Sequence, residues 1–167
     1  VDLVTEYDLQ AEQLIIDRIR TEYPDHAILS EESGQQGEQD EMWVIDPLDG
    51  TTNFAHGLPI FSVSIAFLRN GMPELGVVYA PALEEFFTAI AGRGAWLNDE
   101  PLAVSDTESL NEALMVTGFP YDIRNRQDNN LDHFATFALR TRAVRRLGSA
   151  AIDLCYVAAG RFDGYWE

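Results

Sequence analysis

The sequence predicts a mixed α and β domain built in layers. Three observations indicate this α+β class: an amphipathic helical stretch near the start, a series of short β-rich runs separated by turn residues in the middle, and two further helical stretches before a last strand. A chain of 167 residues can bury a substantial core. One domain covering residues 1–167 therefore accounts for the whole pattern.

The first elements are a helix and two strands. Thr5 and Asp8 have the spacing of a capping box, and apolar residues then recur at helical spacing, which predicts a helix over residues 8–23 that ends before Pro24. A short strand is expected over 27–30 and a buried strand over 42–45. Between them, residues 34–41 contain no apolar side chain and are expected to form an exposed loop.

The middle of the chain is expected to form an antiparallel meander. The runs 61–68, 74–79 and 85–91 are rich in β-forming residues, and short turn segments separate them. Further elements follow: a strand over 114–117, a helix over 130–141, a helix over 150–159 that Gly160 ends, and a last strand over 162–166.

Composition and charge exclude several classes of partner. The chain has 28 acidic and 11 basic residues and a formal net charge of −17. Such a surface repels nucleic acid and anionic lipid, so we expect neither as a partner. No apolar stretch is long enough to span a bilayer and the first residues do not resemble a signal peptide, which favours the cytoplasm. The single cysteine, Cys155, lies in an apolar run and is expected to be a buried, inert thiol.

Residues 43–54 combine two carboxylates with a tight turn. A strand delivers Asp46, Pro47 forces an extended turn, and Asp49 follows three positions after Asp46. Both carboxylates can then converge on one point, and their oxygens suit Mg²⁺. Gly50 permits a tight backbone, and the free amide hydrogens of a helix that starts there form an anion site. The pattern indicates a metal-assisted phosphate site, although in an isolated turn the carboxylates could simply cap backbone amides.

The same twelve residues resemble the signature of the inositol monophosphatase family, Asp-Pro-Ile/Leu-Asp-Gly-Thr-x-Asn-Phe, without a departure. Four other segments resemble elements of that family, in the same order along the chain: 2–8, 30–33, 148–151 and 162–167. Ser30 stands where the family element has Gly. The resemblance therefore spans essentially the whole chain.

The resemblance implies a layered αβαβα sandwich of the sugar-phosphatase type and of considerably greater length. It implies Mg²⁺-dependent hydrolysis of a small phosphate monoester, with myo-inositol monophosphate as the best guess. Two or three Mg²⁺ ions, with Mn²⁺ as a substitute, would activate the attacking water directly, without a phosphoenzyme. Lithium sensitivity and a homodimer are also implied.

The resemblance assigns roles by position. The expected metal ligands are Glu31, Asp46, the Leu48 carbonyl and Asp49. Catalysis is expected to involve Glu31 and a pair formed by Asp8 and Thr51, in which the hydroxyl relays a proton from the attacking water. The expected substrate-binding residues are Asp49, Gly50, Thr51, Gly148, Ser149, Ala150 and Glu167.

Several of these residues have a simpler alternative. Asp8 could act only as the third residue of its helix, where a carboxylate stabilises the helix by roughly 0.5–1 kcal/mol. Glu31 could be one more surface acid, and Gly148 with Ser149 could be an ordinary helix start. The remaining polar candidates are expected to be structural or solvated: His26, His56, His133 and the pair Arg145–Arg146.

Other functions stay open. Fructose-1,6-bisphosphatase, histidinol-phosphatase and nucleotide 3′-phosphatase activities use the same scaffold. A non-catalytic regulatory binding protein is the alternative from another class, because the family's further ligand, in a Trp-Asp-x-Ala-Ala-Gly element, is expected after Glu167. A calcium module is disfavoured, since EF-hand spacing is absent. The missing initiator Met and the end within an apparent strand predict a chain truncated at both ends.

Overall fold

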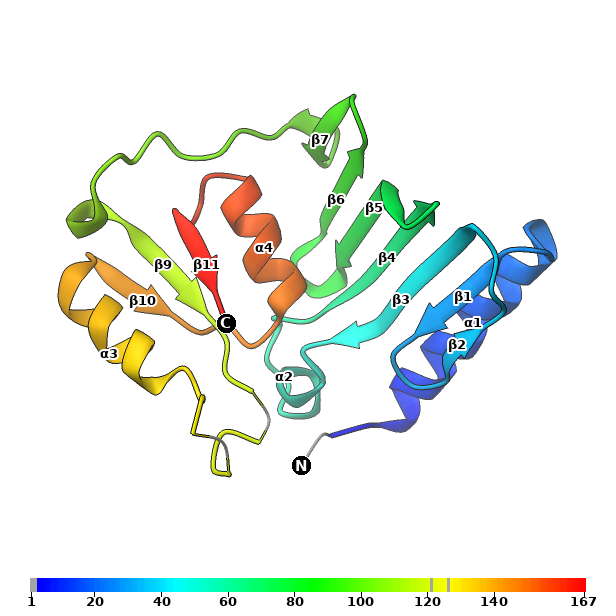
Figure 1. Ribbon diagram of the computed structural model, residues 1–167, viewed down its shortest axis with the longest axis horizontal. Helices are drawn as coiled ribbons and strands as arrows, with labels where there is room; N and C mark the ends of the chain where they lie inside the picture. Colours follow the sequence, from blue (N-terminus) through cyan, green and yellow to red (C-terminus); the bar gives the residue numbers. More distant parts are fainter. Residues whose placement is uncertain (1–2, 121, 126) are drawn as a thin grey trace.

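The layers of the fold appear in a computed structural model that describes residues 3–120, 122–125 and 127–167. Helix α1 (Glu6–Glu22) covers one face of the larger sheet, α4 (Ala150–Ala158) lies between the two sheets, and α3 (Leu131–Arg140) packs on the smaller sheet (Figure 1). The order helix, sheet, helix, sheet, helix confirms the predicted αβαβα class. Asp2, the first residue of the first family-like segment, lies outside the described residues.

Helix α1 begins two residues before its predicted start. The capping box between Thr5 and Asp8 is present, and the helix ends at Glu22 just before Pro24. Its inner face packs against the larger sheet in a core cluster of Ile16, Ile19, Ile28 and Ile45. Burying each of these side chains contributes about 1.5–3 kcal/mol, which fixes α1 across the strands that carry the acidic residues.

The larger sheet has, among the described residues, eight strands in the order β2-β1-β3-β4-β5-β6-β7-β8. Strands β1 (Ala27–Ser30) and β3 (Glu41–Asp49) pair in parallel, and the other pairs are antiparallel. The predicted meander is confirmed as β4 (Ser62–Arg69), β5 (Met72–Ala80) and β6 (Glu85–Ile90). It continues through β7 (Gly94–Leu97) and β8 (Glu100–Pro101), which the sequence reasoning did not predict.

The predicted loop over residues 34–41 is partly wrong. Strand β2 (Gly34–Gln36) pairs antiparallel with β1 at the edge of the sheet. Gly34 makes the turn out of β1 with φ +71°. An edge strand needs only backbone hydrogen bonds on one side and tolerates polar side chains, so the lack of apolar residues did not exclude a strand.

The smaller sheet contains three parallel strands among the described residues, in the order β10 (Ala143–Arg145), β9 (Leu114–Thr117) and β11 (Gly164–Trp166). Strand β9 has its predicted bounds. Helix α3 is one residue shorter than predicted at each end, α4 ends one residue early, and β11 is shorter than predicted. Strand β10 was not predicted. Three short helices complete the described part of the chain: α2 (Thr51–Ala55), η1 (Pro81–Leu83) and η2 (Leu110–Glu112).

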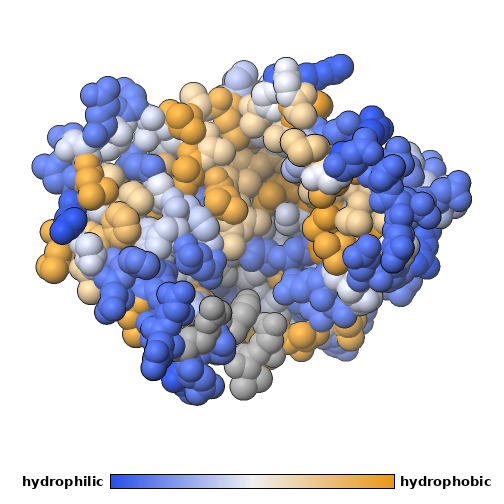
Figure 2. All heavy atoms as spheres, in the orientation of Figure 1, coloured by the Kyte–Doolittle hydropathy of each residue, from blue (hydrophilic) through white to orange (hydrophobic). Residues whose placement is uncertain are grey.

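Apolar side chains gather around the hollow between the two sheets (Figure 2). A cavity of about 190 Å³ lies there, lined by β4, β5 and β6 and by Cys155 and Ala158 of α4. Cys155 is half-buried rather than fully buried. Burial, followed by the charges of Asp49 and Glu85, raises the pKa of its thiol to about 12, as expected for an inert cysteine. No described helix combines the length and apolar character needed to cross a membrane.

Candidate active site

The turn at the end of β3 carries the two aspartates of the signature. The pairing of β3 with β4 shifts register between Asp46 and Asp49, so this segment departs from the regular alternation of a strand. Asp46 Oδ1 accepts a hydrogen bond of 3.1 Å from the Leu48 N–H. Gly50 follows with φ +90°, and a Cβ there would lie 2.9 Å from the Ile60 carbonyl oxygen. Only glycine fits this turn, which brings both carboxylates to one end of the strand.

Glu31, Asp46 and Asp49 form a cluster of negative charge. Burial, then the charges of Glu31 and Asp49, then a hydrogen bond with Glu31 raise the pKa of Asp46 to about 8. A divalent cation would relieve this repulsion, and carboxylate oxygens are the donors that Mg²⁺ prefers. Within the described residues, no group of three or more His, Cys, Asp or Glu side chains has the spacing of a formed metal site. The donor chemistry thus fits a hard cation, and the described carboxyl groups are neighbours that do not meet at one point.

Glu31 is placed by β1 and by α1. It follows β1 directly, and its N–H donates to the Ile45 carbonyl oxygen at 3.2 Å. The buried carboxylate of Glu12 on α1 accepts hydrogen bonds from the N–H and hydroxyl of Ser33 at 3.0 and 3.2 Å. The hydroxyl of Ser30, which replaces the family's Gly, is buried without a hydrogen-bond partner in the described part of the chain. Helix α1 therefore holds the segment in which Glu31 lies.

Asp8 and Thr51 meet although 43 residues separate them. Thr51 Oγ1 lies 2.9 Å from Asp8 Oδ1 and 2.8 Å from the Leu48 carbonyl oxygen. Asp8 is 2% exposed, and its Oδ2 accepts the backbone N–H and hydroxyl of Thr5 at 2.9 and 2.5 Å. Asp8 is thus both a helix cap and the partner of Thr51. Because the hydroxyl hydrogen already faces two acceptors, the lone pairs of Thr51 Oγ1 remain available to accept a proton.

Every residue expected to bind substrate lines one cavity of about 240 Å³. These residues come from three places: the turn after β3, the start of α4 and the end of β11. In the wall, the Asp49 carboxylate caps α4, accepting the Ser149 hydroxyl at 2.5 Å and the N–H groups of Ala150 and Ala151 at 3.2 and 2.8 Å. Ala150 was expected to bind substrate, and its N–H is bound to Asp49.

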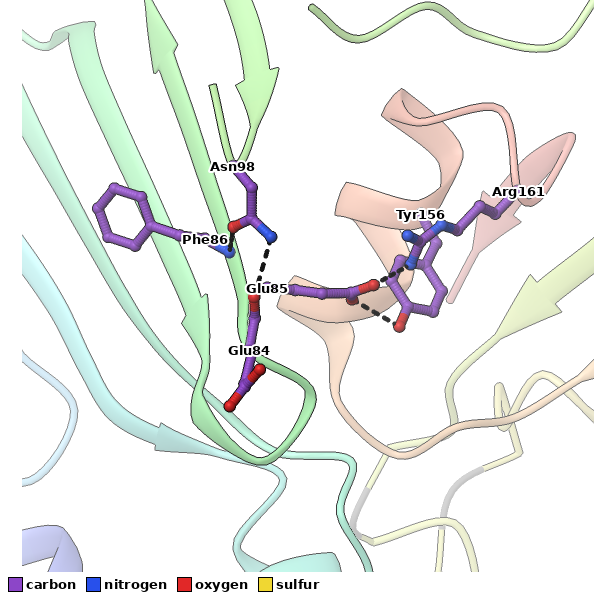
Figure 3. Close-up of polar contacts among 6 residues, drawn as sticks. All are labelled: Glu84, Glu85, Phe86, Asn98, Tyr156 and Arg161. Carbon is purple, nitrogen blue, oxygen red and sulfur yellow. Dashed lines mark hydrogen bonds and ion pairs between the residues drawn. The ribbon is translucent and has the colours of Figure 1, made fainter. Parts of the chain in front are cut away.

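The other end of α4 is fixed to the larger sheet by Glu85 at the start of β6 (Figure 3). Its carboxylate accepts the Tyr156 hydroxyl at 2.8 Å and the Arg161 guanidinium at 2.5 Å. The guanidinium also lies 4.5 Å from the centre of the Tyr156 ring. Asn98 holds the backbone on both sides of Glu85 with hydrogen bonds of 2.9 Å. Asp49 and Glu85 thus hold the two ends of α4 against one sheet.

Comparison with known proteins decides the family. A family model described as the inositol monophosphatase family matches residues 1–167. The chain belongs to this family. It is similar to the inositol-1-monophosphatase of Synechocystis sp., with 55% identity over 99% of this chain and 58% of that protein. It is also similar to the Nus factor SuhB of Pseudomonas aeruginosa, with 51% identity over 99% of this chain and 64% of that protein.

A solved inositol monophosphatase structure, from Anabaena (Nostoc) sp., shares the fold with a TM-score of 0.93. Its sequence is 52% identical, and the match covers 96% of this chain and 64% of the other. The chain therefore spans about three-fifths of the length of these inositol monophosphatase family proteins.

Sequence reasoning missed some residues that line the cavity of this inositol monophosphatase family chain. Asp153 is 2% exposed, and burial, followed by the charges of Asp49 and Glu167, raises its pKa to about 7. A carboxylate within the apolar run 152–159 was the signal that could have revealed it. Asn53 donates to two backbone carbonyls at 2.8 Å, those of Ile60 and Leu147, and so ties α2 to the segment before α4.

Three of the polar residues that were expected to be structural or solvated have clear positions in the structure. His26 accepts a hydrogen bond of 3.1 Å from the Trp43 indole and stacks on Tyr23, as expected of a structural histidine. Arg145 is exposed, as predicted for a solvated pair. Arg146 is also exposed, but it lines the cavity with its guanidinium 5.8 Å from the centre of the Phe119 ring, so the description of the pair as merely solvated was incomplete.

Proposed function

We propose that the protein containing this chain hydrolyses small phosphate monoesters with Mg²⁺, and that myo-inositol monophosphate is its preferred substrate. One observation carries this proposal: Asp49 belongs both to the acidic cluster with Asp46 and Glu31 and to the cavity that holds the expected substrate residues. A site for cations and a site for an ester therefore share one side chain. This is the arrangement that metal-assisted phosphoryl transfer to water requires.

The acidic cluster would hold the cations. Glu31, Asp46 and Asp49 offer carboxylate oxygens, and the Leu48 carbonyl adds a neutral oxygen at the same turn. Two or three Mg²⁺ ions, or Mn²⁺ in their place, would supply positive charge and a water of lowered pKa there. Because the chain has a net charge of −17, such a local reversal of sign is needed before a phosphate ester can approach.

The chain's own groups would then orient the reactants. Thr51 Oγ1 would accept a proton from the attacking water while passing its own hydrogen to Asp8 Oδ1, to which it already donates a hydrogen bond of 2.9 Å. The N–H groups at the start of α2, after Gly50, have no partner within their own helix and can bind phosphoryl oxygens. Glu167, at the end of β11, would accept a hydroxyl of the alcohol part.

Phosphate release tests the proposal. The intact protein with millimolar Mg²⁺ should release phosphate from inositol 1-phosphate, and the variants Glu31→Gln, Asp46→Asn and Asp49→Asn should each lose this activity while keeping their circular dichroism spectrum. Full turnover by Asp46→Asn would contradict the proposal. A substrate panel decides between scaffold-related activities, since faster turnover of fructose 1,6-bisphosphate, histidinol phosphate or a nucleotide 3′-phosphate would replace inositol monophosphate. Inhibition by Li⁺, a homodimer and a cytoplasmic location belong to the same proposal.

A regulatory binding function is a second candidate. The relatives named Nus factor SuhB, at 47–51% identity, favour it. The two functions are separated by the Asp46→Asn variant in the organism that encodes the protein. A growth or gene-expression defect that appears on deletion and is corrected by the inactive variant would assign a role independent of hydrolysis.

A further inference from the structure

Asp153 presents a buried oxygen atom that lacks a partner. The residue lies in the first turns of α4, is 2% exposed and lines the cavity beside Ser149 and Glu167. Its Oδ1 has no hydrogen-bond partner in the described part of the chain. Buried polar atoms are nearly always hydrogen-bonded, and an unsatisfied one destabilises the fold. Less than 1 Å² of this oxygen is exposed, so a partner in the cavity reaches it only after the Asp153 carboxylate rotates toward the cavity.

The donors around Asp153 are already engaged. The Ser149 hydroxyl donates to Asp49 at 2.5 Å, and the Tyr165 hydroxyl donates to Glu167. Arg146 lines the same cavity, yet no ion pair joins it to Asp153 among the described residues. The charge of Arg146 lowers the pKa of Asp153, against the larger effect of burial, but no described side chain donates a hydrogen bond to Oδ1. A group that enters the cavity can therefore supply the missing hydrogen.

The charge of the wall selects the class of ligand. The carboxylates of Asp49, Asp153 and Glu167 all line the cavity, and Arg146 is the one cationic side chain in the described lining. A second phosphate group on the substrate would be repelled by these carboxylates. The hydroxyls of a neutral polyol carry O–H donors, which suit acceptors of this kind.

We propose that Asp153 is a substrate-specificity residue, whose Oδ1 accepts a hydrogen bond from a hydroxyl of the polyol part of the phosphate ester. This inference rests on the proposed phosphatase function and adds a contact to it. The contact selects monoesters of neutral polyols over simple alkyl phosphates, which lack the hydroxyl, and over bisphosphates, which bring a second negative charge.

Kinetics with two esters test this inference on the intact protein with Mg²⁺. One substrate is inositol 1-phosphate, and the other is ethyl phosphate, which has no free hydroxyl on its alcohol part. Asp153→Ala should raise KM for inositol 1-phosphate by about 10–100-fold, the loss expected for a hydrogen bond to a charged group. Asp153→Asn keeps a neutral acceptor oxygen and should raise this KM by a smaller factor. Both variants should leave KM and kcat for ethyl phosphate within about twofold. The exposed Asp132→Asn on α3 is the matched control and should change neither ester.

Each result of these measurements supports or overturns the proposed role of Asp153. An equal loss with both esters, or a change only in the Mg²⁺ concentration needed for half-maximal activity, would overturn the role in polyol recognition. If the wild type hydrolyses no monoester, the phosphatase proposal fails. Saturation-transfer NMR with free myo-inositol then tests Asp153 alone: a signal in the wild type that Asp153→Ala abolishes supports the contact, and its absence in the wild type refutes it.

Discussion

The Thr51 hydroxyl is oriented by two hydrogen-bond acceptors. Its one hydrogen faces Asp8 Oδ1 at 2.9 Å and the Leu48 carbonyl oxygen at 2.8 Å, so its lone pairs point elsewhere. We expect Thr51→Ala to lower kcat for inositol 1-phosphate by about 10²–10⁴-fold, the usual contribution of a positioned proton-transfer group. Thr51→Ser keeps the hydroxyl and should retain most of the rate. Wild-type kcat in Thr51→Ala, measured by steady-state phosphate release, would contradict the proton relay.

Asp46 makes the stability of the metal-free protein depend on pH. Its pKa is raised from 3.8 to about 8, first by burial and then by Glu31 and Asp49. As pH rises through this window the unfolded chain loses the proton first, so the folded state loses stability between about pH 4 and pH 8. Thermal midpoints in EDTA should therefore fall less over this range in Asp46→Asn than in the wild type. A steeper fall in the variant would refute the assigned sign.

Ser30 is a position where a hydroxyl is buried without a partner among the described residues. Removing such a group recovers part of its desolvation cost, about 1–3 kcal/mol. We expect Ser30→Ala to raise the free energy of unfolding in urea, with an unchanged slope against denaturant. A lower free energy of unfolding would mean that the hydroxyl has a partner in solution.

At the scale of elements, the Glu85 contacts hold α4 against β6. The Glu85 side chain is 15% exposed and that of Arg161 is 41% exposed, so solvent screens the pair in part. We expect Glu85→Gln to lower the free energy of unfolding by about 1 kcal/mol, since a half-exposed pair contributes little more. Glu74→Gln breaks an exposed pair with Arg69 on the same sheet and is the control, with a change near zero. Equal changes in the free energy of unfolding of the two variants would show that the Glu85 pair contributes no more than an exposed pair.

The elements that sequence reasoning found share strong local signals. Helix α1 has a capping box and helical spacing, and β4 to β6 are long apolar runs between turns. The missed strands β2, β7, β8 and β10 are two to four residues long, and β2 carries no apolar side chain. Such strands exist because a neighbouring strand offers backbone hydrogen bonds, and their own side chains carry too little apolar pattern to reveal them.

At the scale of the whole molecule, the net charge of −17 means that the acidic side chains of the chain repel one another. Raising NaCl from about 10 mM to about 500 mM shortens the screening length from roughly 30 Å to less than 10 Å. The thermal midpoint of this 167-residue chain in EDTA should therefore rise over this range. A midpoint that falls would show that favourable ion pairs outweigh the repulsion.

Only part of the site could be predicted from residues that lie close together in the sequence. The turn of residues 46–50 could be interpreted from its own chemistry, because carboxylates, proline and glycine stand close together in sequence. The contact between Asp8 and Thr51 came from family resemblance, since 43 residues separate them. Asp153 escaped notice because its importance depends on α4 lying between two sheets, which no local pattern encodes.

The Asp49 carboxylate caps α4, and its charge acts on Asp46, so the proposed cation site and the proposed site for the alcohol would be thermodynamically linked. If cations draw Asp49 toward Asp46 and Glu31, the start of α4 must respond, and the affinity for the alcohol part changes with it. Reciprocity then requires the alcohol to change cation affinity by the same factor. Titrating Mg²⁺ with and without myo-inositol would measure this factor as a ratio of Mg²⁺ affinities. Titrating myo-inositol with and without Mg²⁺ should give the same ratio.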